Sequence, residues 1–261
     1  MTGPTPLLDF FKRGEVARDV RLLAAQGAIA PRAHEQLSIL VLLLEDADPE
    51  VRRTADDTLN RIPGDALRTF LARSDVPLAL REFFADRGVF PEEIPSLEAF
   101  GDADRPLVES AEEPEGTDEK AGEPKTVIQR LAAMNFTERL RAAVKGTREI
   151  RAILIRDTNK MIAAAVLSSP KLTESEVESF ARMAGVSDDV LRTIGTNRAW
   201  MKNYGIVLAL TKNPKTPVAM SMNLIVRLGD RDLATLSVDR NIPEPLRVAA
   251  RKRVLSGSGK K

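Results

Sequence analysis

The chain has 261 residues, of which 43% are apolar and only 4% are aromatic, and it contains no cysteine. Without cysteine, disulfides and thiolate metal sites are excluded, and this composition fits a reducing compartment. Aliphatic side chains must supply the core, which favours helices that cross at short distance.

The net charge of +1 is the sum of unequal parts. Residues 1–94 carry 12 basic and 16 acidic side chains, residues 95–126 carry 3 and 10, and residues 127–261 carry 24 and 12. Such an asymmetry is typical of an acidic tether beside a basic binding module, but solvated helix faces give the same pattern.

Nothing in the sequence predicts a targeting or membrane segment. Residues 1–4 lack a basic region that leads into an apolar core, so we expect no signal peptide. The longest apolar stretch, residues 37–44, is too short to span a bilayer. We therefore expect a soluble, cytoplasmic protein without membrane insertion.

Residues 1–94 show helical spacing of apolar side chains and one distinctive motif at residues 46–59. In this motif Asp48 is placed to cap a helix and Pro49 fits its first turn, while Val51 lies on one face with the apolar positions one and two turns later. The pattern predicts an N-terminal helical block.

The same motif carries a resemblance. Asp46, Asp48, Pro49, Val51 and Arg52, followed by Ala55 and Leu59, resemble the second helix of a HEAT repeat. The resemblance implies that the Asp and Arg side chains join neighbouring repeats and that the apolar side chains form the core between helices. It covers about one repeat, and residues 64–88 resemble a degenerate second one.

Residues 95–126 are dominated by Gly, Pro, Ser, Glu and Asp. A segment of this kind cannot bury enough apolar surface to offset the entropy lost on ordering, so we predict a flexible, disordered acidic linker. The alternative is that this segment folds over the basic C-terminal part.

Residues 127–255 return to short apolar runs of helical spacing, separated by turn signals at residues 169–173, 185–187, 213–217 and 240–243. Isolated helices of about ten residues are marginal in water, so these must stack on one another. We predict a basic helical-repeat domain over 127–255, and a disordered tail over 256–261.

Two of the turn signals carry a second resemblance. Asn213, Pro214 and Pro217, and then Asn241 and Pro243, resemble the punctuation of leucine-rich-repeat-variant and related bacterial HEAT-like repeats. The resemblance implies an α-solenoid that presents interaction surfaces, and it carries over no catalytic residue. The predicted fold is all-α, with HEAT-like helical repeats in two blocks joined by the acidic linker.

A search for catalytic chemistry is negative. His34 is the single histidine, and there is no Gly-x-Ser-x-Gly turn and no glycine-rich phosphate loop. Adjacent acidic residues such as Asp56 and Asp57 point about 100° apart on a helix, so they do not converge on one ligand. We predict no enzymatic activity, no cofactor and no metal.

The segment around residues 198–204 holds the only Trp and the only Tyr of the chain. Trp200 and Tyr204 are spaced i, i+4, beside a neighbouring stripe of Arg198 and Lys202, which is one way to hold a nucleic acid strand or a partner protein. The alternative is that both rings pack between repeats and the cations are solvated. Further basic candidates are Lys212, Lys215, Arg240 and Arg247.

These observations favour a non-catalytic scaffold or adaptor that binds a protein partner. The alternative is nucleic-acid binding through the basic C-terminal repeat surface, which would make affinity fall steeply with salt. A helical-repeat enzyme would need several polar side chains gathered around one cleft.

Overall fold

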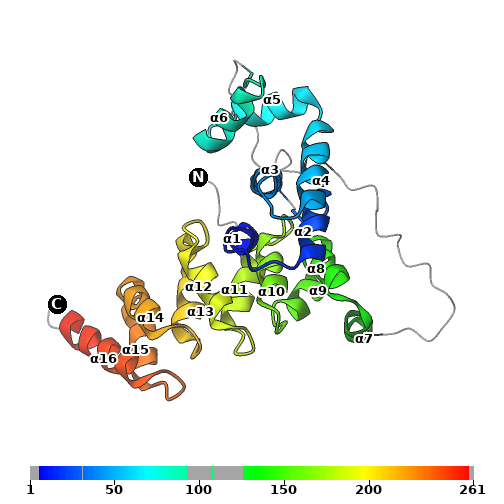
Figure 1. Ribbon diagram of the computed structural model, residues 1–261. Helices are drawn as coiled ribbons and strands as arrows, with labels where there is room; N and C mark the ends of the chain where they lie inside the picture. The colour runs from blue at the N-terminus through cyan, green and yellow to red at the C-terminus, as the bar shows by residue number, and fades with distance from the viewer. Residues whose placement is uncertain (1–5, 31, 93–106, 109–125, 259–261) are drawn as a thin grey trace. The chain divides into compact units, whose positions relative to one another are not determined.

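The computed structural model describes residues 6–30, 32–92, 107–108 and 126–258. Throughout these ranges the regular secondary structure is helical and no strand occurs, so the predicted all-α class is confirmed (Figure 1). Within the same ranges, no helix has the length and apolar character that crossing a membrane requires.

The N-terminal part contains α1 (Pro6–Lys12), α2 (Arg18–Ala25), α3 (Ala33–Leu43), α4 (Pro49–Asn60), α5 (Gly64–Ala72) and α6 (Leu78–Asp86). After the acidic segment follow α7 (Val127–Ala133), α8 (Phe136–Lys145), α9 (Arg148–Leu154), α10 (Lys160–Ser168), α11 (Glu174–Arg182) and α12 (Asp188–Thr196). The remaining elements are η1 (Trp200–Lys202), α13 (Tyr204–Lys212), α14 (Val218–Leu224), η2 (Ile225–Arg227), α15 (Asp230–Val238) and α16 (Glu244–Ser258).

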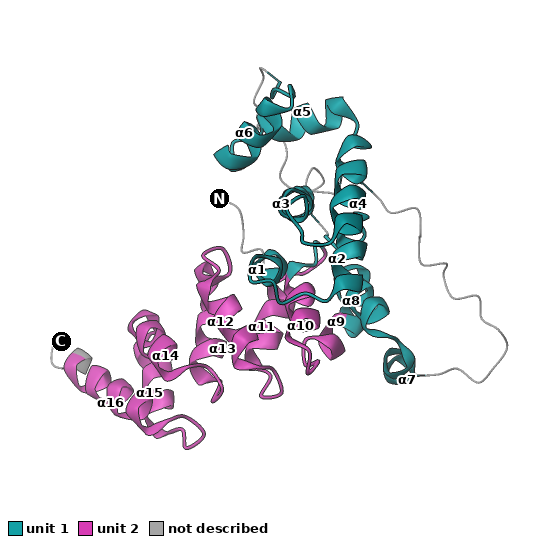
Figure 2. Cartoon of the chain, viewed as in Figure 1, with its two compact units in different colours: residues 1–150, 168–170 teal, residues 151–167, 171–261 magenta. Residues whose placement is uncertain are grey.

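The chain divides into two compact units, coloured separately in Figure 2. Unit 1 comprises residues 1–150 with 168–170, and unit 2 comprises residues 151–167 with 171–261. Composition placed the division at the acidic segment instead. Residues 168–170 belong to unit 1, and two buried serines of this segment bind other residues of that unit. The Ser169 hydroxyl donates to the Val144 carbonyl (2.7 Å), and the Ser168 hydroxyl lies 3.5 Å from the Glu35 carboxylate.

The predicted linker and tail fall largely outside the described residues. Of the linker, Leu107, Val108 and Thr126 are described, so its flexibility stays a prediction. At the C-terminus, α16 continues to Ser258, past the boundary expected at residue 255. Residues 259–261 lie outside the described residues.

Several helix starts follow the capping chemistry of the sequence. Thr173 accepts a hydrogen bond from the backbone N–H of Glu176, and the Glu176 carboxylate accepts from the Thr173 N–H, which completes a capping box. Ser187 caps α12 through the N–H of Val190. At α14, Pro217 is the N-cap residue, and no side chain caps this helix.

In unit 2 the helices begin at regular steps along the sequence. One series, α11, α13 and α15, begins at residues 174, 204 and 230, which are steps of 30 and 26 residues. The other series, α10, α12, α14 and α16, begins at residues 160, 188, 218 and 244, which are steps of 28, 30 and 26. Each helix of unit 2 buries an apolar face, and the fully buried side chains include Phe180, Leu191, Ile194, Ile206 and Leu236.

Candidate interaction surface

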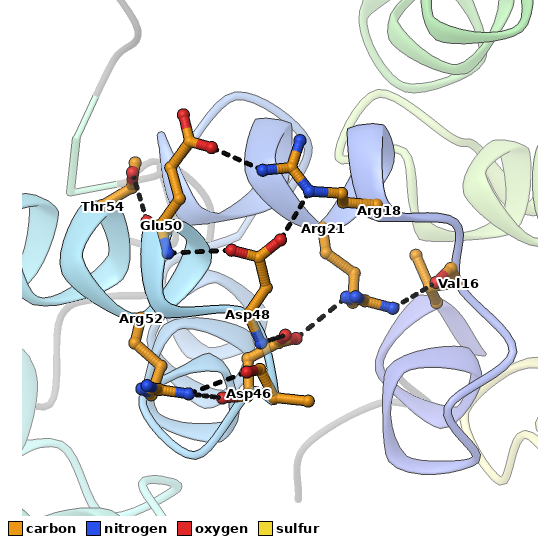
Figure 3. Close-up of polar contacts among 9 residues, drawn as sticks. Val16, Arg18, Arg21, Asp46, Asp48, Glu50, Arg52 and Thr54 are labelled. Carbon is orange, nitrogen blue, oxygen red and sulfur yellow. Dashed lines mark hydrogen bonds and ion pairs between the residues drawn. The ribbon is translucent and has the colours of Figure 1, made fainter.

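The motif that resembles a HEAT repeat joins α4 to α2 through two aspartates, as Figure 3 shows. The Arg18 guanidinium contacts the Asp48 carboxylate at 2.5 Å, and Arg21 pairs with Asp46 at 2.9 Å. Asp48 also accepts the N–H of Glu50 (2.8 Å), which makes it the N-cap residue of α4, with Pro49 as the first helical residue. The hydrogen bond from Arg18 lowers the pKa of Asp48.

Arg52 has a local role. Its guanidinium donates to the carbonyls of Asp46 (2.5 Å) and Ala47 (3.0 Å), so it closes the loop that precedes its own helix. Val51 is fully buried, as its place in the motif predicts. The aspartates therefore form the link between helices distant in sequence, and these contacts of Arg52 stabilise the loop between α3 and α4.

Unit 2 contains a buried ion pair that sequence reasoning missed. Arg151 of α9 donates from Nε (3.0 Å) and from one terminal nitrogen (2.8 Å) to the same oxygen of Glu176 in α11. The two side chains are only 5% and 3% exposed. The spacing of 25 residues hides this contact in the sequence.

The segment with the only Trp and Tyr is not one continuous helix. Trp200 lies in the short η1, and Asn203 is extended and ends it, so Tyr204 begins a new helix. The expectation that these two rings share one helix face is therefore wrong. Trp200 is half-buried and Tyr204 is 45% exposed, while Arg198 and Lys202 are exposed.

The Tyr204 hydroxyl forms a polar contact between α13 and the start of α15. It donates to the Asp232 carboxylate and accepts the backbone N–H of Gly229 at 3.1 Å. The hydrogen bond to Asp232 raises the pKa of Tyr204 because ionisation would remove the donated proton beside a carboxylate. The phenol is thus used in joining two helices of unit 2.

One shallow hollow of about 190 Å³ lies beside α11 and α13. It is lined by Arg182, Leu208, Ala209, Lys212, Asn213 and Pro214. Lys212 is the only residue of the predicted basic set in this lining, and Arg182, which the sequence analysis did not single out, pairs with Glu178. The lining brings two cations together, although the charge of Arg182 is already partly balanced.

Asn213 has a structural role that agrees with its place in the turn. Its side-chain Nδ2 donates to the carbonyls of Ala181 (2.8 Å) and Met183 (3.1 Å), and its Oδ1 accepts the N–H of Lys215 (3.0 Å). This buried amide therefore ties the end of α11 to the turn after α13. Asn241 is exposed instead, and there Asp239 accepts its backbone N–H (2.9 Å).

The remaining predicted residues do not gather at one place. Lys215 and Arg240 are exposed and Arg247 is half-buried, and none of them lines the hollow at Lys212. Pro214 is exposed, whereas Pro217 and Pro243 are half-buried beside helix starts. Across the described residues, no group of three or more His, Asp or Glu side chains could hold a metal ion.

Exposed apolar side chains are concentrated near the C-terminus, and sequence reasoning missed them. Of the ten large apolar side chains found exposed among the described residues, seven lie between residues 204 and 255. We call six of them the C-terminal apolar set: Val218, Met222, Val226, Val238, Val248 and Leu255. Helical spacing carries the signal, since Val218 and Met222 are one turn apart and Val248 and Leu255 are two turns apart.

Comparisons with models of protein families, with curated proteins and with solved structures find no match to this chain.

Proposed function

We propose that this chain is a non-catalytic helical-repeat adaptor that binds a protein partner through the C-terminal apolar set. The observation that carries the proposal is the concentration of exposed apolar side chains on α14, η2, α15 and α16. An apolar side chain that stays exposed to water gains none of the free energy that burial would provide. Groups of such side chains on a folded protein mark sites where another molecule covers the surface. Aliphatic and Met side chains among cations suit a protein partner.

The repeat interpretation has its support in the spacing of unit 2. Helices of both series begin at steps of 26 to 30 residues. Contacts between successive members of a series recur at helix starts: Lys160 of α10 pairs with Asp189 of α12 (2.7 Å), and Tyr204 of α13 binds Asp232 of α15. A stack of equivalent helix pairs is the arrangement that HEAT-like repeats use to build an extended binding surface.

Charge indicates what kind of protein would bind. The outer face of α16 carries Arg251 and Lys252 between Val248 and Leu255, and all four side chains are exposed. A second copy of this face would bring like charges together, which is unfavourable. We therefore propose a partner that offers apolar side chains bordered by Asp or Glu.

Nucleic-acid binding remains the second candidate, and the contacts of Tyr204 argue against it. A strand stacked on Tyr204 would place its phosphates near the Asp232 carboxylate, which repels them. Trp200, the other predicted stacking residue, is half-buried. The observation that favours nucleic-acid binding is the exposure of four cations: Arg198, Lys202, Lys215 and Arg240.

Site-specific photo-crosslinking in cells would test the proposal. A crosslinking residue at Met222 should capture one discrete protein, and the same residue at Asn223, its exposed neighbour, should not, because adjacent side chains point about 100° apart on a helix. Val218→Asp and Val226→Asp should each abolish the product from position 222 while leaving the circular dichroism spectrum unchanged.

Equal capture from positions 222 and 223, or capture that survives both Asp variants, would contradict the proposal. Electrophoretic mobility shifts with duplex and single-stranded DNA would decide the second candidate. Binding in about 50 mM salt that is lost by about 200 mM salt would favour nucleic acid, and no shift in low salt would exclude it.

A further inference from the structure

A buried glutamine of unit 1 binds a segment that lies 71 and 72 residues further along the chain. Gln36 belongs to α3 and is 1% exposed. Its Oε1 accepts the backbone N–H groups of Leu107 (2.7 Å) and Val108 (3.2 Å). Its Nε2 donates to the carbonyls of Val108 (2.8 Å) and Gly27 (3.1 Å). Both ends of the amide are therefore fully used.

Gln36 recognises the backbone of the 107–108 segment rather than its side chains. One amide binds both the N–H and the C=O of Val108, as the opposite residue of an antiparallel strand pair would do. Such a contact can form with any residue that has a backbone N–H. The preference of the site for one peptide sequence over another therefore depends on how the side chains of the bound segment pack. Leu107 and Val108 are both half-buried.

Two helices of unit 1, α3 and α4, and the turn after α2 contribute to this site. Gly27, just after α2, has φ +81°, and a Cβ at this position would lie 3.2 Å from Gln36 Nε2 and 3.5 Å from Val108 Cβ. The fully buried Thr58 of α4 lies on the same side, with its methyl 3.6 Å from that Cβ position. We call Gly27, Gln36 and Thr58 the Gln36 cradle.

An empty cradle would leave a buried amide without three of its four partners. Buried polar groups without partners are strongly disfavoured, so water or another peptide segment would have to replace the bound one. The contact with the 107–108 segment is small, and it is held by three hydrogen bonds and two half-buried side chains. Its strength in the intact chain comes from tethering, which raises the local concentration of the segment.

We propose that the Gln36 cradle is a docking site for a short linear peptide, and that Leu107 and Val108 occupy it as an exchangeable internal ligand. The partner that fits is a peptide with two adjacent aliphatic residues, recognised through its backbone. The site lies in unit 1 and is independent of the C-terminal apolar set. Displacement of the 107–108 segment by such a peptide would release the acidic segment from this anchor point.

The test uses the full chain and a fluorescent synthetic peptide of residues 103–112, followed by fluorescence anisotropy. Wild-type protein should bind the peptide weakly, because its own segment competes. The double variant Leu107→Asp, Val108→Asp should bind at least about tenfold more tightly, and adding Gln36→Glu, which removes both donated hydrogen bonds, should reverse that gain. A peptide carrying the same two Asp substitutions is the control and should not bind.

Hydrogen exchange of the full chain, without added peptide, measures independently whether the 107–108 segment is bound. The backbone amides of Leu107 and Val108 should exchange at least about tenfold more slowly in wild type than in Gln36→Leu, which removes the oxygen that accepts both N–H groups. Three outcomes would overturn the proposal: unprotected amides in wild type, equal peptide binding with and without Gln36→Glu, or a Leu107→Asp, Val108→Asp variant that fails to fold. The last result would make the segment part of the fold rather than a ligand.

Discussion

Arg151 and Glu176 form a nearly fully buried ion pair that joins α9 to α11 within unit 2, with one guanidinium nitrogen 2.8 Å from the carboxylate. Taking both charges out of water is costly, and the pair is tolerated because each charge gains further partners. Glu176 also accepts from the N–H and hydroxyl of Thr173, and Arg151 donates to the Lys171 carbonyl. The pair, the capping box and the turn before α11 therefore form one network.

Removing one member of this pair should be strongly destabilising. Arg151→Met leaves a buried carboxylate without its cation, and we expect a loss of about 3–5 kcal/mol in the free energy of unfolding. Urea denaturation of the full chain would measure it. The double variant Arg151→Met, Glu176→Gln should lose far less than the sum of the single variants, because no buried charge is left alone.

The matched control is the exposed pair of Arg192 and Asp188, at 3.6 Å on α12. Asp188→Asn should change stability by less than about 1 kcal/mol, since solvent screens exposed pairs. Similar losses for the buried and exposed pairs would show that Arg151 and Glu176 are not held as described.

The same pair should make stability depend on acidity. Burial disfavours the charged form of Glu176, but the hydrogen bonds from Thr173 and Arg151 outweigh it and lower the pKa of the carboxyl. A lowered pKa in the folded state means that the contribution is complete above the unfolded value, about 4.3, and is lost as pH falls through the folded value. The difference in unfolding free energy between wild type and Glu176→Gln should therefore shrink on acidification. An unchanged difference between pH 7 and pH 3 would contradict this prediction.

Tyr204 is the only tyrosine, so its ionisation can be followed directly by ultraviolet absorbance. We expect a midpoint above the ordinary value of about 10, because the hydroxyl donates to Asp232. Asp232→Asn should move the midpoint down towards that value. Circular dichroism at each pH would confirm that the chain stays folded, and an identical midpoint in both proteins would disprove the contact.

Gly27 and Gly14 both have positive φ, +81° and +69°, but only Gly27 is crowded. Alanine at Gly14 should cost about 1 kcal/mol, the price of a left-handed backbone for an L-residue, since nothing lies within 4 Å of the added methyl. Gly27→Ala meets Gln36 Nε2 as well, so we expect about 2–3 kcal/mol. Thermal unfolding of the two variants side by side would measure the difference, and equal losses would show that the cradle is looser than described.

Asn213 and Asn241 occupy related turns in the sequence and should respond differently to truncation. Asn213→Ala would leave the Ala181 and Met183 carbonyls without their donor, at an expected cost of about 1–3 kcal/mol. Asn241 is exposed and its turn is held by Asp239, so Asn241→Ala should stay within about 0.5 kcal/mol. Urea denaturation would rank them, and the reverse order would refute the assigned contacts.

Features that depend on residues close together in the chain could be predicted from the sequence. The N-cap at Asp48 and the helical spacing of the buried faces both depend on contacts within about one helical turn. Even so, the break at Asn203 was missed, because aromatic residues spaced i, i+4 fit a continuous helix equally well. The extended backbone at Asn203, with its side chain accepting the N–H of Gly205, separates the two rings instead.

The amino-acid sequence by itself determined that this protein is helical, which residues begin many of its helices, and which apolar faces must be covered. Only the tertiary structure decided that Arg151 meets Glu176, that Gln36 binds the 107–108 segment, and which aliphatic side chains stay uncovered at the C-terminus. The reason is physical: capping and periodicity act over a few residues, whereas these contacts depend on how helices far apart in the chain pack together.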